Sequence, residues 1–225
     1  ASIELLTAEG RQLDQLRFGI QVIDQTIGRK GNQWQLLAEG TPGKVNGNAA
    51  LLGSTDDLRI NEWSGGGEGD DWLELYQRGN QPVDISALYL TDDPSLAGKT
   101  KHAIANLSFV GPKSWVVFRA DGEPQRGSDH LNFRLSSKGE TLRIYSDSLN
   151  VIDEILVAES FVQGGSNGRL PDGEDRLVSF DVVETSKGIP NHTQIEGLQI
   201  NELLLTPRTP SGRAIEVLNF GANPV

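Results

Sequence analysis

Cysteine is absent from the 225 residues of this chain. The chain therefore has no disulfide bond, no thiolate metal ligand and no cysteine nucleophile, which excludes zinc fingers and cysteine enzymes. Long apolar runs are absent as well, since no stretch approaches the roughly 18 residues that a membrane-spanning helix needs. Basic residues are few, with 20 Lys and Arg against 31 Asp and Glu. The net charge of −11 disfavours nucleic acid as a partner, and no membrane insertion is expected.

Helical periodicity is also missing, because no segment keeps an apolar period of 3.6 residues over three turns. Short apolar runs alternate with Gly, Asn and Asp turns instead, which is typical of strands. This pattern predicts strands at residues 58–63, 72–77, 83–90, 103–107, 115–119, 131–135, 142–146, 151–157 and 177–182, with similar runs at 3–6, 16–20 and 34–37 separated by turns such as 28–32. The predicted fold class is all-β, an antiparallel β-sandwich of immunoglobulin-like architecture in repeated modules.

Parts of the sequence return after about 140 residues. The segment Ile60-Asn61-Glu62 returns at residues 200–202, and Glu74 returns as Glu216. Earlier pairs join Asp14 to Asp153, Gly28 and Arg29 to Gly168 and Arg169, and Thr41, Gly43 and Asn46 to Thr185, Gly188 and Asn191. The pairs predict the C-terminal part of a preceding module at residues 1–50, a complete module at 58–192 and the N-terminal strands of a following module at 198–225. A longer repetitive parent protein is expected.

Six segments of the predicted complete module carry a resemblance to a known family. In order they read RINEW, DDWLELYQRGNQPVDISALYLTDD, GPKSWVVFRADGE, LNFRLSSKGETLRIYSDSLNVIDEI, NGRLPDGED and TSKGIPN. Together they resemble the lamin tail domain in the form found in large bacterial proteins. The resemblance implies an immunoglobulin-like fold and an accessory module of secreted or surface proteins. The glycine-rich loop at 64–69 and Ala214, which stands where Trp72 does, depart from the pattern.

Two glutamates stand within otherwise apolar predicted strands, Glu62 and Glu74. Strict alternation predicts that Glu62 shares a face with Ile60, and that Glu74 shares one with Trp72 and Tyr76, so both carboxyls should be partly covered. A covered carboxylate needs a partner, which in an enzyme serves catalysis or a metal and elsewhere serves the fold. Because both glutamates recur as Glu202 and Glu216, a fold requirement is the favoured interpretation.

Acidic turns raise the alternative of a calcium site, with Asp92 and Asp93 as the candidate ligands. Asp also favours turns by bonding backbone amides, and the ordered spacing of known calcium loops is absent. The four tryptophans, at positions 34, 63, 72 and 115, suggest core packing or, alternatively, a polysaccharide-binding surface. The three histidines lie in unlike surroundings and are expected at the surface or in turns.

These patterns predict a non-enzymatic protein without catalytic residues or a cofactor. The expected role is a structural or adhesive repeat of a larger extracellular or cell-surface protein, acting by module packing and by strand complementation with neighbouring copies. Residues 1–50 and 198–225 together would still lack a counterpart of about residues 84–139, so they complete one another only in part. The alternative is an accessory module for calcium or polysaccharide, attached to a secreted enzyme.

Overall fold

The computed structural model describes residues 1–65, 71–136, 138–157, 164–193, 198–205 and 213–219. The chain divides into two compact units, Ala1–His192 and Thr193–Val225, and each is described by itself. The helices of the described residues are the short 3₁₀ turns η1 (Thr55–Asp57), η2 (Gly98–Thr100) and η3 (Pro124–Arg126). No described helix is long and apolar enough to cross a membrane.

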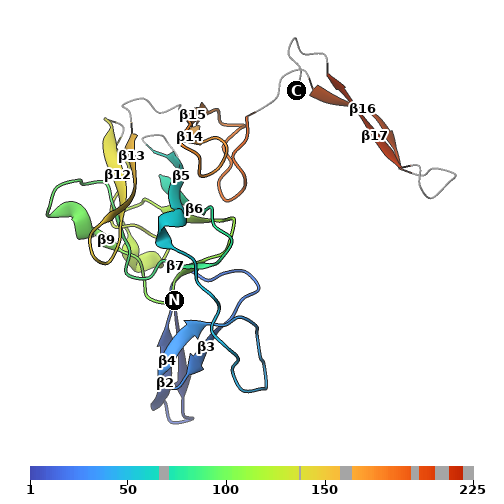
Figure 1. The fold of residues 1–225 in the computed structure, drawn as a ribbon. Helices are drawn as coiled ribbons and strands as arrows, with labels where there is room; N and C mark the ends of the chain where they lie inside the picture. The colour runs from blue at the N-terminus through green and yellow to red at the C-terminus, as the bar shows by residue number, and fades with distance from the viewer. Residues whose placement is uncertain (66–70, 137, 158–163, 194–197, 206–212, 220–225) are drawn as a thin grey trace. The chain divides into compact units, whose positions relative to one another are not determined.

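Two antiparallel sheets form the larger part of the first unit (Figure 1). One sheet has the strand order β11 (Ser114–Arg119), β6 (Trp72–Gln77), β5 (Leu58–Ser64), β14 (Ser166–Arg169) and β15 (Leu177–Phe180). The other has the order β13 (Val151–Val157), β12 (Glu140–Tyr145), β8 (Tyr89–Thr91) and β9 (His102–Ala103), and a short ladder joins β7 (Val83–Asp84) to β10 (Phe109–Val110). The predicted all-β class is confirmed, and these sheets are arranged as in a β-sandwich; residues 58–192 are called the sandwich below.

The core of the sandwich consists of apolar side chains that both sheets contribute. Ile60 and Leu75 come from the first sheet and Leu90, Leu142 and Ile144 from the second, and all five are fully buried. Burying such a side chain contributes about 1.5–3 kcal/mol, so this shared core is what holds the two sheets together.

The strand predictions were most accurate where apolar alternation is regular, as at 72–77 and 151–157. The predicted strand at 83–90 is wrong in its middle, because a turn containing Ala87 at φ 60° separates β7 from β8. Residues 131–135 form no strand, although Leu131, Phe133 and Leu135 are buried in the core. Conversely, β14 was missed because its SNGR sequence reads as a turn.

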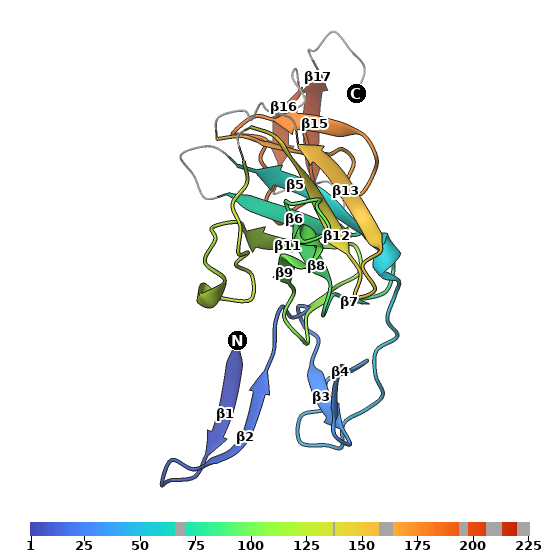
Figure 2. The same cartoon turned by 90° about the vertical axis from the view of Figure 1, so that its left-hand side faces the viewer.

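Residues 1–50, called the N-terminal segment, form two separate hairpins (Figure 2). The first pairs β1 (Ser2–Leu6) with β2 (Gln12–Arg17), and the second pairs β3 (Ile27–Lys30) with β4 (Gln33–Leu36). The turn predicted at 28–32 is present but shorter, because strand β3 extends to Lys30 and the turn is confined to Gly31 and Asn32. Between the hairpins, the Phe109 amide donates to the Ile20 carbonyl at 2.9 Å, which ties the segment to the sandwich.

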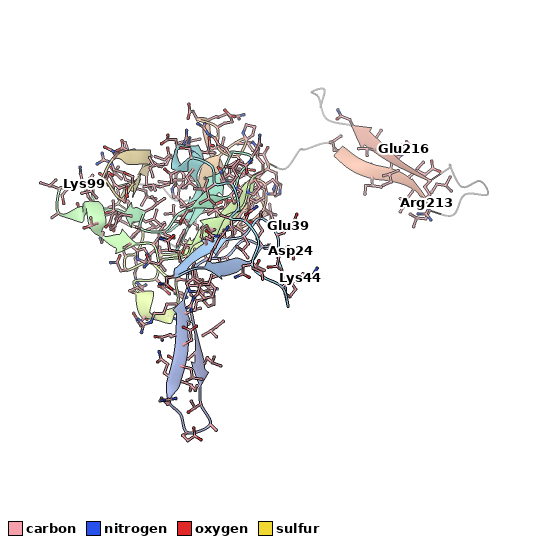
Figure 3. The ribbon with its side chains drawn as sticks, turned by 60° about the horizontal axis from the view of Figure 1, so that its bottom comes forward. Asp24, Glu39, Lys44, Lys99, Arg213 and Glu216 are labelled. Atoms are coloured by element: carbon pink, nitrogen blue, oxygen red, sulfur yellow. The ribbon has the colours of Figure 1, made fainter. Side chains whose placement is uncertain are left out.

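The second unit contains one antiparallel hairpin of β16 (Leu198–Leu204) and β17 (Ala214–Asn219), called the C-terminal hairpin. Its side chains are exposed on both strands, including Glu216, labelled in Figure 3. Ile200 and Ile215 are 70% and 65% exposed. An uncovered apolar surface of this kind is costly in water and marks an interaction surface.

We expect Ile60→Ala to lower the free energy of unfolding by about 2–5 kcal/mol, because it leaves a cavity in a fully packed core. The matched control is Ile23→Ala, at a residue 86% exposed, which should change it by less than about 0.5 kcal/mol. Urea unfolding followed by tryptophan fluorescence measures both. Equal effects of the two substitutions would contradict the described core.

Candidate functional site

A β-bulge at Asn61 determines where the two glutamates point. The ladder between β5 and β6 pairs Ile60 with Leu75 and then Glu62 with Glu74, so Asn61 is the extra residue. A bulge reverses the alternation of faces beyond it. Ile60 therefore lies in the core, whereas Glu62 lies with Glu74 on the opposite face of the sheet. The prediction that Glu62 shares a face with Ile60 was wrong for this reason.

Glu62 is fully buried and all its hydrogen bonds are internal. One carboxylate oxygen accepts from the Ser166 hydroxyl and, at 3.1 Å, from the Ser186 amide. The other accepts from the Ser186 hydroxyl at 3.0 Å. Burial raises the pKa of Glu62 above its ordinary value, and the bonds from Ser166 and Ser186 oppose that rise.

Glu74 is fully buried beside Glu62. Its oxygens accept from Asn61 Nδ2 at 3.0 Å and from the Gly188 amide at 2.6 Å. Burial, with smaller contributions from Glu62 and Asp172, raises the pKa of Glu74 to about 8. Glu74 is therefore largely protonated at neutral pH, which removes the repulsion between two buried carboxylates.

A second buried polar group, the Arg–Asp cap, consists of Arg169 and Asp153. Arg169 Nη2 lies 3.1 Å from both Asp153 oxygens. Strand β14 ends at Arg169, so β14 offers no backbone partners to Ile60 on β5. The Ile60 amide instead donates to Asp153 at 2.8 Å, and its carbonyl accepts from Arg169 Nε at 2.8 Å. The cap thus joins β13 of one sheet to β5 of the other.

Asn61 and Asn191 fasten the loops that cover the glutamates. Asn61 Nδ2 donates to Asp172 at 2.8 Å, and Asn61 Oδ1 accepts from the Gly173 amide at 2.9 Å. Asn191 Nδ2 donates to the Arg169 carbonyl at 2.8 Å, and its side-chain oxygen accepts from the Ser186 hydroxyl at 2.9 Å. The loops on either side of β15 are therefore held against the face that carries Glu62.

The polar atoms of this arrangement bond to other groups of the protein and stabilise the fold. Each carboxylate oxygen of Glu62 and Glu74 accepts at least one protein hydrogen bond. Among the residues that the structure describes, no three His, Asp or Glu side chains gather as a possible metal site. The geometry supplies a stabilising hydrogen-bond network in which the Glu62 and Glu74 carboxyl groups are buried away from solvent.

The N-terminal segment contains an ion pair with contacts like those of the Arg–Asp cap. Arg29 lies 3.2 Å from both oxygens of Asp14, and Asn46 Nδ2 donates to the Arg29 carbonyl at 2.8 Å. These contacts match those that Arg169, Asp153 and Asn191 make in the sandwich. The side chains of Arg29 and Asp14 are 42% and 49% exposed, against 5% and 11% for Arg169 and Asp153.

Hydrogen bonds also correct one pair of the sequence alignment. Thr41 Oγ1 lies 3.5 Å from Asn46 Oδ1, and the Lys44 amide donates to the Thr41 carbonyl. In the sandwich, Ser186 contacts Asn191 and the Ile189 amide in the same two ways. Thr41 therefore corresponds to Ser186 and not to Thr185.

The C-terminal hairpin has the register of the β5–β6 ladder, position by position. Ile200 pairs with Val217, Glu202 pairs with Glu216, and Asn201 is the extra residue of a bulge. Asn201 Nδ2 donates to Glu216 at 2.6 Å, the bond that Asn61 makes to Glu74. Here, however, both partners are exposed.

The calcium candidates Asp92 and Asp93 are both engaged within the protein. Asp92 Oδ1 lies 2.6 Å from Lys101 Nζ, so an ammonium group already neutralises it. Asp93 Oδ1 accepts from the Ser95 amide at 2.9 Å, and this bond lowers the pKa of Asp93. The first contact is an ion pair and the second is turn chemistry, and the calcium site stays a prediction.

The tryptophans fall into two groups. Trp63 and Trp72 are both buried; Trp63 belongs to the core, as expected, whereas the Lys187 ammonium lies 5.3 Å from the centre of the Trp72 ring. Trp34 and Trp115 are half-buried, but the Arg29 guanidinium covers the Trp34 ring at 5.0 Å and the Tyr76 ring lies 5.2 Å from Trp115.

The expectation for the histidines was wrong at two positions. His102 and His130 are only 8% and 7% exposed. His130 Nδ1 lies 2.6 Å from Asp121, and burial lowers the pKa of His102.

Comparison with known proteins gives no identification: no family model matches the chain, and no curated protein matches it significantly. The site therefore rests on its geometry. Sequence reasoning singled out Glu62 and Glu74 but assigned no role to Ser166, Ser186 or the Arg–Asp cap. Recurrence was the signal that could have found the cap, because Asp153 and Arg169 both have earlier counterparts.

We expect the stability of the chain to fall as pH rises from about 5 through about 8. Folded Glu74 holds a proton up to a pKa of about 8, whereas unfolded Glu74 releases it near 4.5. Unfolding therefore releases a proton in this window, and each such group contributes up to about 1.4 kcal/mol per pH unit. Glu140, whose pKa burial raises to about 7, acts in the same direction.

Glu74→Gln should flatten the upper part of this dependence in urea unfolding series at several pH values. The control is Glu216→Gln, the same change at the matched position of the C-terminal hairpin. A Glu74→Gln curve parallel to that of the unaltered chain would show that Glu74 does not hold a proton in the folded protein.

Arg169→Ala should destabilise the sandwich by about 3–5 kcal/mol, because it leaves Asp153 buried without its partner. Arg29→Ala removes the same side chain from an exposed pair and should cost about 0–1 kcal/mol. Thermal and urea unfolding of both variants measure the difference. Equal losses of stability would mean that burial does not determine how much the Arg–Asp cap contributes.

Proposed function

We propose that this chain is a non-enzymatic structural repeat protein related to the lamin tail domain. In this proposal, residues 58–192 are a complete module, residues 1–50 are the C-terminal part of a preceding one and residues 198–225 begin a following one. The modules act by packing and strand pairing within a larger extracellular or cell-surface protein, with copies of the module as partners.

One observation carries the proposal: the polar contacts of the sandwich recur where no complete site exists. The Arg29–Asp14 pair and the Asn201–Glu216 bond reproduce contacts of the sandwich in otherwise different surroundings. A catalytic group gains nothing from a copy that lacks the rest of its site. A residue that the module needs in order to fold is expected in every copy.

The buried carboxyl groups have hydrogen-bond partners within the protein, and this supports the same conclusion. Catalytic acids and bases need contact with a substrate, and buried pairs with perturbed pKa values also arise as structural networks. Glu62 and Glu74 are covered by the loops that carry Ser186 and Gly188. Their role in the proposal is to hold those loops on the sheet.

The competing function is an accessory module for calcium or polysaccharide. Asp92 and Asp93 favour it by their adjacency, and Trp34 and Trp115 by their partial exposure. Two contacts argue against it: Lys101 forms an ion pair with Asp92, and the Arg29 guanidinium covers the Trp34 ring.

We expect the chain to bring no saturable heat of calcium binding in titration calorimetry and no retention on insoluble cellulose, chitin or xylan. A calcium-dependent rise in melting temperature that Asp92→Asn abolishes would establish the competing function instead. Retention on a polysaccharide that Trp34→Ala removes would do the same. Glu9→Gln, on the exposed β1–β2 turn, serves as the control variant.

A further inference from the structure

Two carboxyl groups lie at one end of the sandwich core, beside the loop between β8 and β9. Asp92, directly after β8, comes two residues after the core residue Leu90. Glu140, at the start of β12, comes two residues before the core residue Leu142. β8 and β12 are neighbours in the sheet, and side chains two residues apart on a strand share a face. Both carboxyl groups therefore extend the core-facing rows, and the Asp92 side chain is only 13% exposed.

The amine of Lys101 is in close contact with one of these carboxyl groups. Lys101 Nζ lies 2.6 Å from Asp92 Oδ1, closer than the about 2.7–2.9 Å of an ordinary charged hydrogen bond. This contact lacks the angles of a hydrogen bond, since Asp92 Oδ1 is buried and accepts none from the described residues. A C–O bond spans about 1.2 Å, so the nitrogen lies no more than about 3.8 Å from the carboxyl carbon. The ring of the core residue Phe133 lies 5.5 Å from the same nitrogen.

Glu140 supplies a group that can carry a proton between these two side chains. Its Oε1 accepts from the Ser136 amide at 2.7 Å. Burial raises the pKa of Glu140 to about 7 against the lowering effect of that bond; Asp92 adds to the rise and Lys101 opposes it. A carboxyl group of this kind both takes up and releases protons at neutral pH. An amine, a carboxyl carbon and a proton carrier are thus gathered at one place.

We infer that Lys101 and Asp92 join in an intramolecular isopeptide bond, with Glu140 as the proton carrier. The Lys101 nitrogen attacks the Asp92 carboxyl carbon, so that the Nζ–Cγ bond forms and one Cγ–Oδ bond breaks. Glu140 carries two protons, one at a time, from the nitrogen to the leaving oxygen. An ammonium and a carboxylate become a neutral amide and one molecule of water, and the step needs no oxidant, reductant or other reactant.

The fold provides what the same two groups lack when they are free in water. Groups held in reacting geometry have effective concentrations on the order of 10⁵–10⁸ M. The Lys101 side chain is 34% exposed, so the water that is formed can leave. The bond reinforces the short β8–β9 ladder, which consists of the pairs Tyr89–Ala103 and Leu90–His102. It forms within one sandwich and does not depend on the proposed function.

Mass spectrometry tests the inference on the full chain. The purified chain should be lighter than its sequence mass by one water molecule. Trypsin cleaves after Lys99 but not after an acylated Lys101, so peptides 79–99 and 100–113 should stay joined, and fragmentation should place the link at Asp92. A succinimide at an Asp-Gly step also releases water, but it leaves the cleavage after Lys101 intact.

Matched variants test each group. Lys101→Arg keeps a cation beside Asp92 but removes the nucleophilic amine, so the full sequence mass should return; Lys99→Arg, at the lysine labelled in Figure 3, should leave the link complete. Glu140→Gln should leave most chains unlinked, because losing a general acid–base slows such a step by about a hundredfold or more. Glu174→Gln, at an exposed glutamate, should have no effect. Circular dichroism confirms that each variant is folded.

The full sequence mass in the folded, unaltered chain, with cleavage after Lys101, would overturn the inference. A loss of water that persists in Lys101→Arg would also overturn it, because the water would then come from other groups. A Glu140→Gln variant as fully linked as the unaltered chain would overturn the role of Glu140 as the proton carrier.

Discussion

The fold depends on how the half of strand β5 that does not pair with β14 is capped. Strand β14 runs beside β5 only as far as Glu62 and Trp63, so the Ile60 amide and carbonyl have no ladder partner on that side. Buried backbone groups without partners are costly. Asp153 accepts from the Ile60 amide, and Arg169 donates to the Ile60 carbonyl. Since Asp153 belongs to the opposite sheet, the same cap fixes the sheets relative to each other. Gly168 is required here, because a Cβ would lie 2.5 Å from the Asn61 carbonyl oxygen.

The bulge at Asn61 also determines which charged side chains lie on the same face of the sheet. Without it, Glu62 would point into the apolar core beside Ile60, where no donor is available. With it, Glu62 and Glu74 share the face that Ser186 and Gly188 cover. Burial then favours the protonated form of Glu74, and the hydrogen bonds of Ser166 and Ser186 compensate Glu62. The pair connects sheet geometry to the closure of the loops around β15.

The sequence predicts the fold class and the strands with regular alternation, because those signals are local. It does not predict the bulge, which depends on a single extra residue in one strand of a pair. Strands β3 and β14 were missed for a related reason: glycine and polar residues there serve close packing and hydrogen bonding, and they look like turn residues. Glu62 and Glu74 stood out as charges within apolar strands, while Ser166 and Ser186 did not, because serines are common in turns. Only the fold brings their hydroxyls to Glu62 across more than a hundred residues.

Similar polar contacts occur in parts of the chain that differ in burial. The Arg29–Asp14 pair and the Asn46 bond to Arg29 form in the N-terminal segment, and Asn201 bonds Glu216 in the C-terminal hairpin. The two ion pairs differ in burial: Arg29–Asp14 is largely exposed, whereas Arg169–Asp153 is almost wholly covered. An exposed ion pair contributes little to stability, whereas losing one partner of a covered pair is severe. The same polar contact therefore has a different weight in the two places: it matters most where the sandwich covers it.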